Sequence, residues 1–257
     1  MSSNGRLVSK MDETYVRLYP DLELDHFWWK VRRRLVGQLI SNRVDLTQCS
    51  VLDIGCGSGV TMEYLSDAGA AAVRGIEIDP LALRPGSPIN DRIVLGGLLE
   101  VNIDETYDIV VMLDVLEHIE DDTSALAKVA SCISRDGLLI LTVPAYGWLW
   151  SSHDVTNAHF RRYSVVQLRA RLESSGFRVE QIGYMFAGLI PPKLVMRWLE
   201  MAGVDLGNAS VEAGRRLFLS ELAYRWFRME AALAVRFARM LPFGSSVVAV
   251  ARPSRHE

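Results

Sequence analysis

The stretch VLDIGCGSG, residues 51–59, joins a short strand to a glycine-rich turn. Its first four residues are apolar except Asp53, which is typical of a strand that is buried on both faces. Gly55, Gly57 and Gly59 allow tight turning and let backbone N–H groups approach a ligand at the strand end. The spacing is G-x-G-x-G, whereas dinucleotide-binding Rossmann proteins have G-x-G-x-x-G. The stretch therefore predicts a parallel α/β sheet with a ligand site at the carboxyl end of this strand.

Apolar strands alternate with amphipathic helices on both sides of this stretch. Most of the strands are runs of Val, Ile and Leu without polar alternation, as in a parallel sheet that helices cover on both faces. Further strands are predicted at 71–78, 92–97, 107–113, 138–144, 178–185 and 245–253, and helices at 26–40, 61–70, 121–134 and 164–177. The pattern predicts a doubly wound, Rossmann-like α/β fold.

Composition limits the class of protein. A chain of 257 residues with 49% hydrophobic content can form one large core. A net charge of -3 and a pI near 6.0 argue against a nucleic-acid partner. Cys49, Cys56 and Cys132 have no metal-type spacing and suggest reduced thiols, and the polar N-terminus lacks the apolar region of a signal peptide. No apolar run reaches the roughly 18 residues of a membrane span. We expect a cytoplasmic protein that could still contact a membrane surface peripherally.

Acidic residues accompany the glycine turn. Asp53, at the end of its strand, could hold a loop or receive a ligand amine. Glu77 ends the next strand about 20 residues after the turn, where an acidic side chain can accept both hydroxyls of a ribose. The two features together predict a nucleoside-containing ligand.

These residues closely resemble the class I S-adenosylmethionine-dependent methyltransferases, in matching order over about residues 49–184. The resemblance implies S-adenosylmethionine as cofactor and a seven-stranded sheet of order 3-2-1-4-5-7-6 whose last strand is antiparallel. It also implies a role for each cofactor-site residue: Asp53, Gly55, Gly57 and Gly59 line the methionine part, Glu77 binds the ribose, Leu98 in GGLL lies beside the adenine, and Asp114 and His118 in LDVLEHI close the site.

The resemblance extends to the ends of the chain. The segments HFWW.VRRR, WLWSSHD…H.RRYS and PFGSSVVAVAR resemble a largely uncharacterised bacterial subgroup, which identifies no acceptor. We expect a single domain that comprises an N-terminal helical lid (1–48), a cofactor-binding core (49–185), a helical insertion (186–241) and a final strand with its tail (242–257).

The segment 148–164, WLWSSHDVTNAHFRRYS, has no clear helical or strand period and follows the fifth strand on the acceptor side. One of its histidines is a candidate general base, His159 ahead of His153, with Asp154 orienting the ring. In the alternative interpretation, Asp154 and Arg161 only pin the loop. The candidate acceptor-binding residues are Arg161, Arg162 and Tyr163. Tyr163 could instead pack in the core, and Ser164 is expected to cap the next helix.

A divalent cation is a further alternative at the fourth strand. Asp114-x-x-Glu117-His118 is similar to the E-x-x-E-H motif with which small-RNA 2′-O-methyltransferases and ubiquinone-pathway O-methyltransferases bind a cation. His153 or His159 could complete such a set. Because Asp replaces the first Glu and LEHI usually shapes the cofactor pocket, we assign no metal ligand from the sequence.

A long helix is predicted at about 211–240 in the insertion. Its Arg225, Arg228, Arg236 and Arg239 fall within about 80° of one another, with Glu221 one turn before Arg225. This stripe is either a solvated face or a basic amphipathic surface for an anionic membrane or a lipid phosphate.

The sequence thus predicts a methyltransferase that acts on a small-molecule or lipid-linked acceptor, with O-methylation and a histidine general base as the favoured chemistry. The alternatives are a nicotinamide-dependent Rossmann oxidoreductase and a non-enzymatic module that binds a cofactor or docks on a membrane. The oligomeric state is not predicted.

Overall fold

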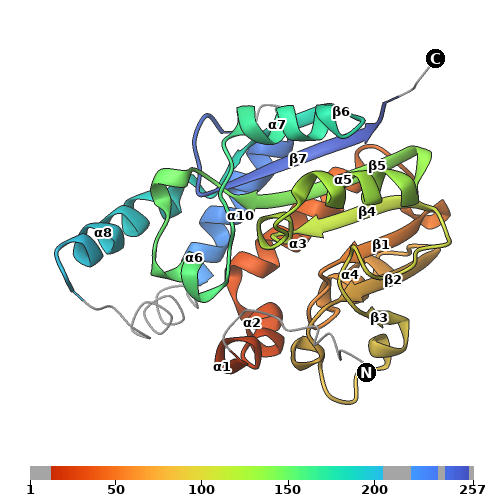
Figure 1. The fold of residues 1–257 in the computed structure, drawn as a ribbon, viewed down its shortest axis with the longest axis horizontal. Coiled ribbons are helices and arrows are strands. Elements are labelled where there is room, and N and C mark those ends of the chain that lie inside the picture. Colours follow the sequence, from red (N-terminus) through yellow and green to blue (C-terminus); the bar gives the residue numbers. More distant parts are fainter. Residues whose placement is uncertain (1–12, 205–220, 237–240, 255–257) are drawn as a thin grey trace, which may run out of the picture.

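A seven-stranded sheet runs through the centre of the computed structural model, which describes residues 13–204, 221–236 and 241–254 (Figure 1). The strands are β1 (Ser50–Ile54), β2 (Ala72–Glu77), β3 (Ile93–Leu95), β4 (Tyr107–Leu113), β5 (Ile133–Pro144), β6 (Phe177–Met185) and β7 (Ser246–Pro253). Their order is β3-β2-β1-β4-β5-β7-β6, and β7 pairs antiparallel with both β5 and β6. The predicted fold, strand order and antiparallel last strand are confirmed.

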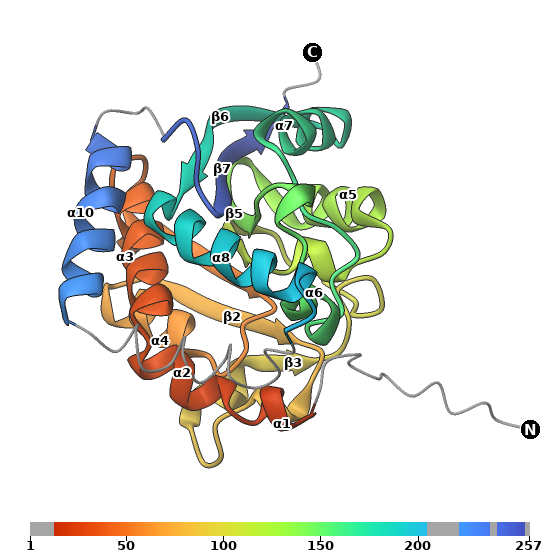
Figure 2. The ribbon, with the colours of Figure 1, turned by 90° about the vertical axis from the view of Figure 1, so that its left-hand side faces the viewer.

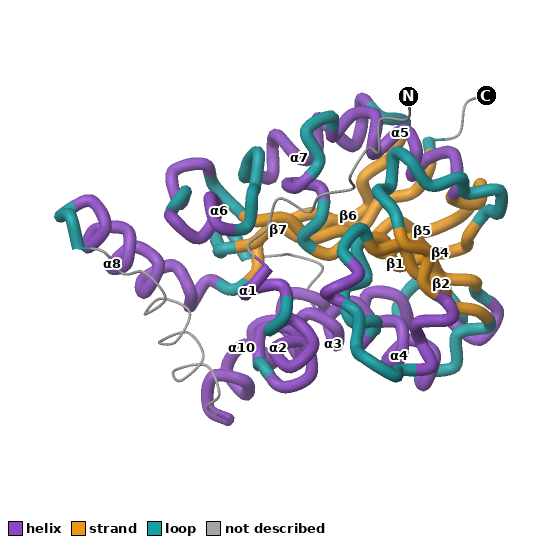
Figure 3. The backbone as a smooth tube through the Cα atoms, turned by 60° about the horizontal axis from the view of Figure 1, so that its bottom comes forward, coloured by secondary structure: helices purple, strands orange, loops and turns teal. Residues whose placement is uncertain are grey.

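Two layers of helices cover the sheet (Figures 1 and 3). The helices are α1 (Glu13–Val16), α2 (Tyr19–Asp25), α3 (Phe27–Ser41), α4 (Val60–Asp67), α5 (Asp122–Cys132), α6 (Ser152–Thr156), α7 (Val165–Ser174), α8 (Ile190–Met201) and α10 (Glu221–Arg236). Side chains alternate along the strands: Leu138 and Ile140 of β5 pack with α3, α4 and α10, whereas Leu139 and Leu141 pack with α5 and α7. No described helix is long and apolar enough to cross a membrane.

Helix α3 is part of the core layer. The predicted apolar side is confirmed, because Val31, Leu35 and Leu39 are buried against the sheet. Arg32 on the same helix is also buried. Helix α3 therefore packs on the sheet, and the N-terminal lid expected over residues 1–48 stays a prediction.

The insertion between β6 and β7 contains two described helices. Helix α8 extends away from the body of the molecule (Figures 1 and 3), whereas α10 packs along α3 (Figure 2). The helix predicted at 211–240 is described only over α10, where Arg225 pairs with Glu221 at 3.0 Å as expected. Residues 205–220 and 237–240, with Arg239, lie outside the described residues, as does the side chain of Arg236.

The segment 148–164 is more regular than predicted. It contains a 3-10 turn at Gly147–Leu149 and the one-turn helix α6. A capping box between Ser151 and Asp154 forms this helix, because each side chain bonds to the backbone N–H of the other residue. The absence of a helical period was therefore misleading, since a single turn is too short to show one.

Candidate functional site

The carboxyl ends of β1, β4, β5 and β6 meet at one edge of the sheet, and backbone strain gathers there. Asp114 follows β4 with φ 55°, Tyr146 follows β5 with φ 56°, and Phe186 follows β6 with φ 61°. Ala158, in the loop after α6, has φ 53° and is the fourth such non-glycine residue among those described. Left-handed non-glycine residues concentrate at functional sites, so this edge is the candidate site.

The glycine turn joins β1 to α4 at this edge. Gly55, Gly57 and Gly59 all have positive φ, which confirms the tight turn. At Gly55 the requirement for glycine is also steric, because a Cβ would lie 2.3 Å from Cγ2 of Val115. The N–H of Gly55 donates to the Ile76 carbonyl at 2.8 Å and fixes the turn against β2. The backbone here leaves no room for another residue type.

Buried carboxylates surround the glycine turn. Glu77 Oε2 accepts the Gly57 N–H at 2.8 Å, and Oε1 accepts the Asp79 N–H at 2.9 Å. Asp53 is 2% exposed, and its Oδ2 has no hydrogen-bond partner among the described residues. Burial and the charge of Glu23 raise the pKa of Asp53 to about 8. An orphaned buried carboxyl oxygen fits a ligand with a cationic or amine group. Leu98, the expected adenine neighbour, is buried beside Ile76.

Asp114 is held by an arginine that the sequence analysis did not select. Asp114 Oδ2 accepts a hydrogen bond from Thr142 Oγ1 at 2.8 Å and another from Arg32 Nη1. The guanidinium lies 4.4 Å from the Trp28 ring centroid, and its Nε has no partner among the described residues. The signal was present in HFWWKVRRR, because Trp28 and Arg32 are four residues apart on one helix face.

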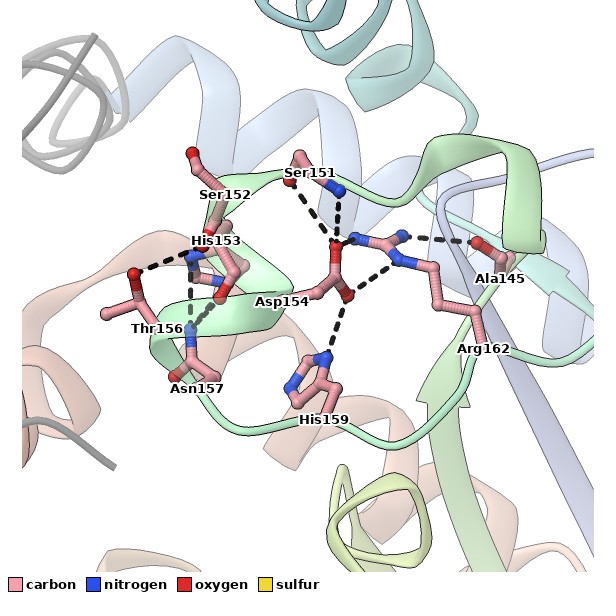
Figure 4. A network of polar contacts seen from close by, with 9 residues as sticks. All are labelled: Ala145, Ser151, Ser152, His153, Asp154, Thr156, Asn157, His159 and Arg162. Carbon is pink, nitrogen blue, oxygen red and sulfur yellow. Dashed lines mark hydrogen bonds and ion pairs between the residues drawn. The ribbon is translucent and has the colours of Figure 1, made fainter. Parts of the chain in front are cut away.

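A single buried carboxylate organises the acceptor-side loop (Figure 4). Asp154 is 0% exposed, and Arg162 binds it in a bidentate manner through Nε at 2.7 Å and Nη2 at 2.8 Å. Its Oδ2 also accepts the Ser151 N–H at 2.9 Å, and its Oδ1 accepts a bond from His159 Nδ1 at 2.8 Å. Burial alone would raise the pKa of Asp154, but the bonds from His159 and Arg162 hold it well below its ordinary value.

The histidines of this loop have different partners. Because Asp154 remains ionised, it accepts a hydrogen bond from the Nδ1–H of His159, and this tautomer leaves Nε2 as a hydrogen-bond acceptor. His153 instead lies beside the Asn157 side chain, 6.3 Å from the His159 ring centroid. Burial, followed by the charge of Lys193, lowers the pKa of His153 to about 4. The arrangement therefore favours His159 as the base.

A second buried group faces His159 from the turn after β4. One ligand atom each of Glu117, His118 and His159 lies within 4.8 Å of the others, and the rings of His118 and His159 are 4.6 Å apart. Glu117 is 0% exposed, and both its carboxyl oxygens lack a partner among the described residues. Burial, then Asp114, raises the pKa of Glu117 well above its ordinary value, while burial and His159 lower that of His118 to about 4. Asp114 is not part of this group, since it pairs with Arg32.

The residues expected to bind the acceptor have protein partners. Arg161 pairs with Asp122 at 3.0 Å and donates to the Glu120 carbonyl at 2.5 Å. Tyr163 is buried, and its hydroxyl donates to Asp122 Oδ2 at 2.8 Å. Arg162 is committed to Asp154. Acceptor binding by these three residues stays a prediction, and their contacts within the protein do not favour it. The predicted Ser164 cap is confirmed, because its side chain accepts a hydrogen bond from the Gln167 N–H at 3.2 Å.

Helix α8 brings a cation to the same loop. Arg197 Nη1 donates to the Trp150 carbonyl, and Glu200 accepts a bond from Ser152 Oγ at 2.6 Å. Lys193 lies one turn before Arg197 on this side of the helix, and its charge acts on His153. Burial, then Arg162, lowers the pKa of Lys193 to about 8. Lys193 could not be selected from the sequence, because nothing in PPKLV distinguishes it from a surface lysine.

Comparison with known proteins identifies the family to which this chain is similar. Residues 23–182, more than half of the chain, match the family described as a methyltransferase domain. A probable S-adenosylmethionine-dependent methyltransferase of Mycolicibacterium smegmatis is 26% identical over 190 residues, which are 72% of each chain. The ubiquinone biosynthesis O-methyltransferase of Xanthomonas euvesicatoria is 27% identical over 182 residues, 67% of this chain and 70% of that protein.

A solved structure has the same fold. Haemonchus contortus phosphoethanolamine N-methyltransferase 2, in complex with phosphomonomethylethanolamine and S-adenosylhomocysteine, superposes with a TM-score of 0.62 at 15% identity. The match covers 99% of this chain and 61% of that one. Neither the nicotinamide-dependent oxidoreductase nor the non-enzymatic module, weighed as alternatives from the sequence, fits these matches.

Proposed function

The chain belongs to the class I S-adenosylmethionine-dependent methyltransferases, and from that premise we propose that it methylates an oxygen of a small-molecule or lipid-linked acceptor, with His159 as general base. S-Adenosylmethionine is its methyl donor, and the donor supplies a methyl group already activated on a sulfonium centre. The orphaned Asp53 oxygen beside the glycine turn fits the amine end of this cofactor. Glu77, at the end of β2, would hold the ribose.

The pair formed by Asp154 and His159 carries the proposal. His159 Nε2 would take the proton of the acceptor hydroxyl while the acceptor oxygen takes the methyl group that the donor would supply from its sulfonium sulfur. The products are the methylated acceptor and S-adenosylhomocysteine, and the proton remains on the imidazole. Asp154 orients the ring and stabilises the imidazolium, while Arg162 keeps Asp154 ionised. In this role Arg162 is a positioning residue and does not touch the acceptor.

Oxygen as the methylated atom is supported by the relatives and by the chemistry of the site. The Xanthomonas relative is a ubiquinone biosynthesis O-methyltransferase. A hydroxyl acceptor needs a base, and His159 offers one, whereas an already nucleophilic amine needs less help. Lys193 would stabilise negative charge on the ionising hydroxyl or on an acidic group of the acceptor.

A lipid-linked acceptor is supported by the insertion. Helix α8 exposes Val195, Trp198 and Met201, with Trp198 68% and Met201 76% exposed. Helix α10 exposes Trp226 beside Arg225. Aromatic and apolar side chains beside arginines suit the interface of an anionic membrane, where such an acceptor would be reached.

Transfer of labelled methyl into an extract of the source organism, separated into organic and aqueous phases, tests the acceptor class. Label in the organic phase supports a lipid-linked acceptor, and label confined to the aqueous phase supports a polar metabolite. With the labelled acceptor as substrate, His159→Gln should lower kcat by about 10²–10⁴-fold and leave the affinity for S-adenosylhomocysteine unchanged. His153→Gln is the matched control and should retain most turnover. Equal losses in both variants would remove His159 as the specific base.

A second candidate retains the reaction but adds a divalent cation on Glu117, His118 and His159. The observation that favours it is the buried Glu117, whose oxygens have no partner among the described residues. A cation there would polarise the acceptor oxygen. Metal analysis of purified protein, with Glu117→Gln as comparison, distinguishes the two. A stoichiometric metal lost in the variant supports the cation, and a metal-free active enzyme that resists chelators excludes it.

A further inference from the structure

Glu23 reaches the glycine turn from outside the core. It lies on α2, in the N-terminal segment, and its side chain is buried rather than solvated. Its Oε2 accepts the Ser58 N–H at 3.1 Å and a second bond from the Ser58 hydroxyl. A Cβ on Gly57 would lie 2.3 Å from Glu23 Oε1, so the carboxylate rests directly on the turn. Helix α2 is therefore anchored to the cofactor side of the site through Glu23.

The turn is surrounded by more negative than positive groups. Burial raises the pKa of Glu23, and Glu23 in turn raises that of Asp53. Glu77 is the third buried carboxyl here, and its charge raises the pKa of Glu23 as well. Two cations lie nearby: Arg32 is engaged by Asp114, and Arg33 donates to the backbone carbonyl of Glu23 rather than to its carboxylate.

One carboxyl oxygen of this cluster is left unpaired. Asp53 Oδ2 is almost completely buried and has no hydrogen-bond partner among the described residues. Buried acids are retained in folded proteins when a counter-charge or a ligand compensates them. The cofactor's methionine end carries an α-ammonium group, which supplies such a charge.

We propose that Glu23 is a cofactor-binding residue that, together with Asp53, binds the α-ammonium group of the cofactor's methionine end. The two carboxylates come from different segments, α2 and β1, so the ammonium group bridges the N-terminal segment to the sheet. Glu23 thereby couples the position of α2 to cofactor binding. This inference rests on the established cofactor and on no assumption about the acceptor or about His159.

Local contacts hold Glu23 in place for this role. Arg33 Nη1 donates to the Glu23 carbonyl and fixes α2 against α3. The Ser58 bonds keep the carboxylate on the turn, and a glutamine at this position can accept the same two bonds. Glu23→Gln therefore removes the negative charge and leaves the shape of the contact.

Calorimetric titration of two ligands into the full-length chain tests the proposal. S-Adenosylhomocysteine has the amino-acid end, whereas 5′-methylthioadenosine shares its adenosine and sulfur but lacks that end. We expect Glu23→Gln to weaken S-adenosylhomocysteine binding by about 10- to 100-fold, which is the range for the loss of a hydrogen bond to a charged group. Binding of 5′-methylthioadenosine should weaken by less than about twofold, because this ligand has no ammonium group. Asp25→Asn, on the same helix and exposed beside Lys30, is the matched control and should change neither affinity.

Three results would overturn the proposal. Equal weakening of both ligands would make Glu23 a purely structural contact of α2. Unchanged affinity for S-adenosylhomocysteine would exclude a bond to the ammonium group, and tighter binding would mean that Glu23 competes with the cofactor. Melting curves of Glu23→Gln without ligand check that the variant is folded, and Glu23→Asp, which keeps the charge but shortens the side chain, should recover part of the lost affinity. Loss of methyl transfer in His159→Gln with normal ligand binding bears only on the base.

Discussion

The cofactor half and the acceptor half of the carboxyl edge are shaped by different parts of the chain. In the cofactor half, residues 53–59, the backbone itself forms the site, because glycines with positive φ leave no room for a side chain. In the acceptor half, residues 145–163, one carboxylate sets the path of the loop by bonding to Arg162, His159 and the Ser151 N–H. The cofactor half depends on glycines that have no side chain, and the acceptor half depends on the negative charge of Asp154. Each half should therefore fail for its own reason.

Removal of the acceptor-half carboxylate should have the largest effect. Asp154→Ala leaves the buried Arg162 without its counter-charge, which we expect to lower the free energy of unfolding by about 3–5 kcal/mol. Methyl transfer should be lost, because His159 loses its orienting partner. Denaturant unfolding measures the loss of stability, and titration with S-adenosylhomocysteine at low temperature measures whether the cofactor half still binds its ligand. Asp67→Ala, at an exposed residue, is the control. If affinity for S-adenosylhomocysteine fell with stability, the two halves would not be independent.

The converse change breaks the cofactor half. Gly55→Ala places a methyl group against Val115 at a φ of 66°, and strain of this kind costs about 1–3 kcal/mol. We expect the affinity for S-adenosylhomocysteine to fall by at least about tenfold, as measured by calorimetry. Gly86→Ala is the control, since Gly86 also has positive φ but has nothing within 4 Å of a Cβ. A loss of affinity in Gly86→Ala as large as in Gly55→Ala would assign the effect to general strain.

The smallest expected effect is a pH dependence of cofactor binding. The pKa of Asp53 is 3.8 when unperturbed and about 8 in the folded protein, because of burial and then Glu23. The ligand-free folded state therefore holds a proton that the unfolded chain releases, so its stability falls as pH rises from about 4 to 8. An ammonium group favours ionised Asp53, and affinity for S-adenosylhomocysteine should rise several-fold between pH 6 and pH 8, by at most about tenfold per unit.

Calorimetry in two buffers of different ionisation enthalpy measures the accompanying proton release. Asp53→Asn should lower both the release and the pH dependence, and what remains is assigned to Glu23, whose pKa is also raised. The acceptor half should not contribute through Asp154, whose pKa lies well below this range. An equally steep dependence in Asp53→Asn would move the titration to another group.

The two halves also differ in how far the sequence predicts them. Strand order and the glycine turn follow from local patterns, namely apolar runs and Gly55 with its neighbours. The bidentate bond between Asp154 and Arg162 depends on the path of an irregular loop, so Arg162 was expected to face the acceptor. Glu23 contacts Ser58 across 35 residues and belongs to no periodic pattern. Such single long-range polar contacts leave no mark on the sequence, whereas burial of a whole strand does.

The position of β7 has a consequence for how the molecule is made. This strand follows the insertion in the sequence, yet it lies between β5 and β6 and joins them. During synthesis β5 and β6 therefore remain unjoined until the insertion has left the ribosome, and β6 meanwhile exposes an unpaired edge that other chains could join. The half of the sheet that carries β1, β2 and β4 can pair earlier. We expect the acceptor half to be the last part of the protein to fold and the part on which chaperones act.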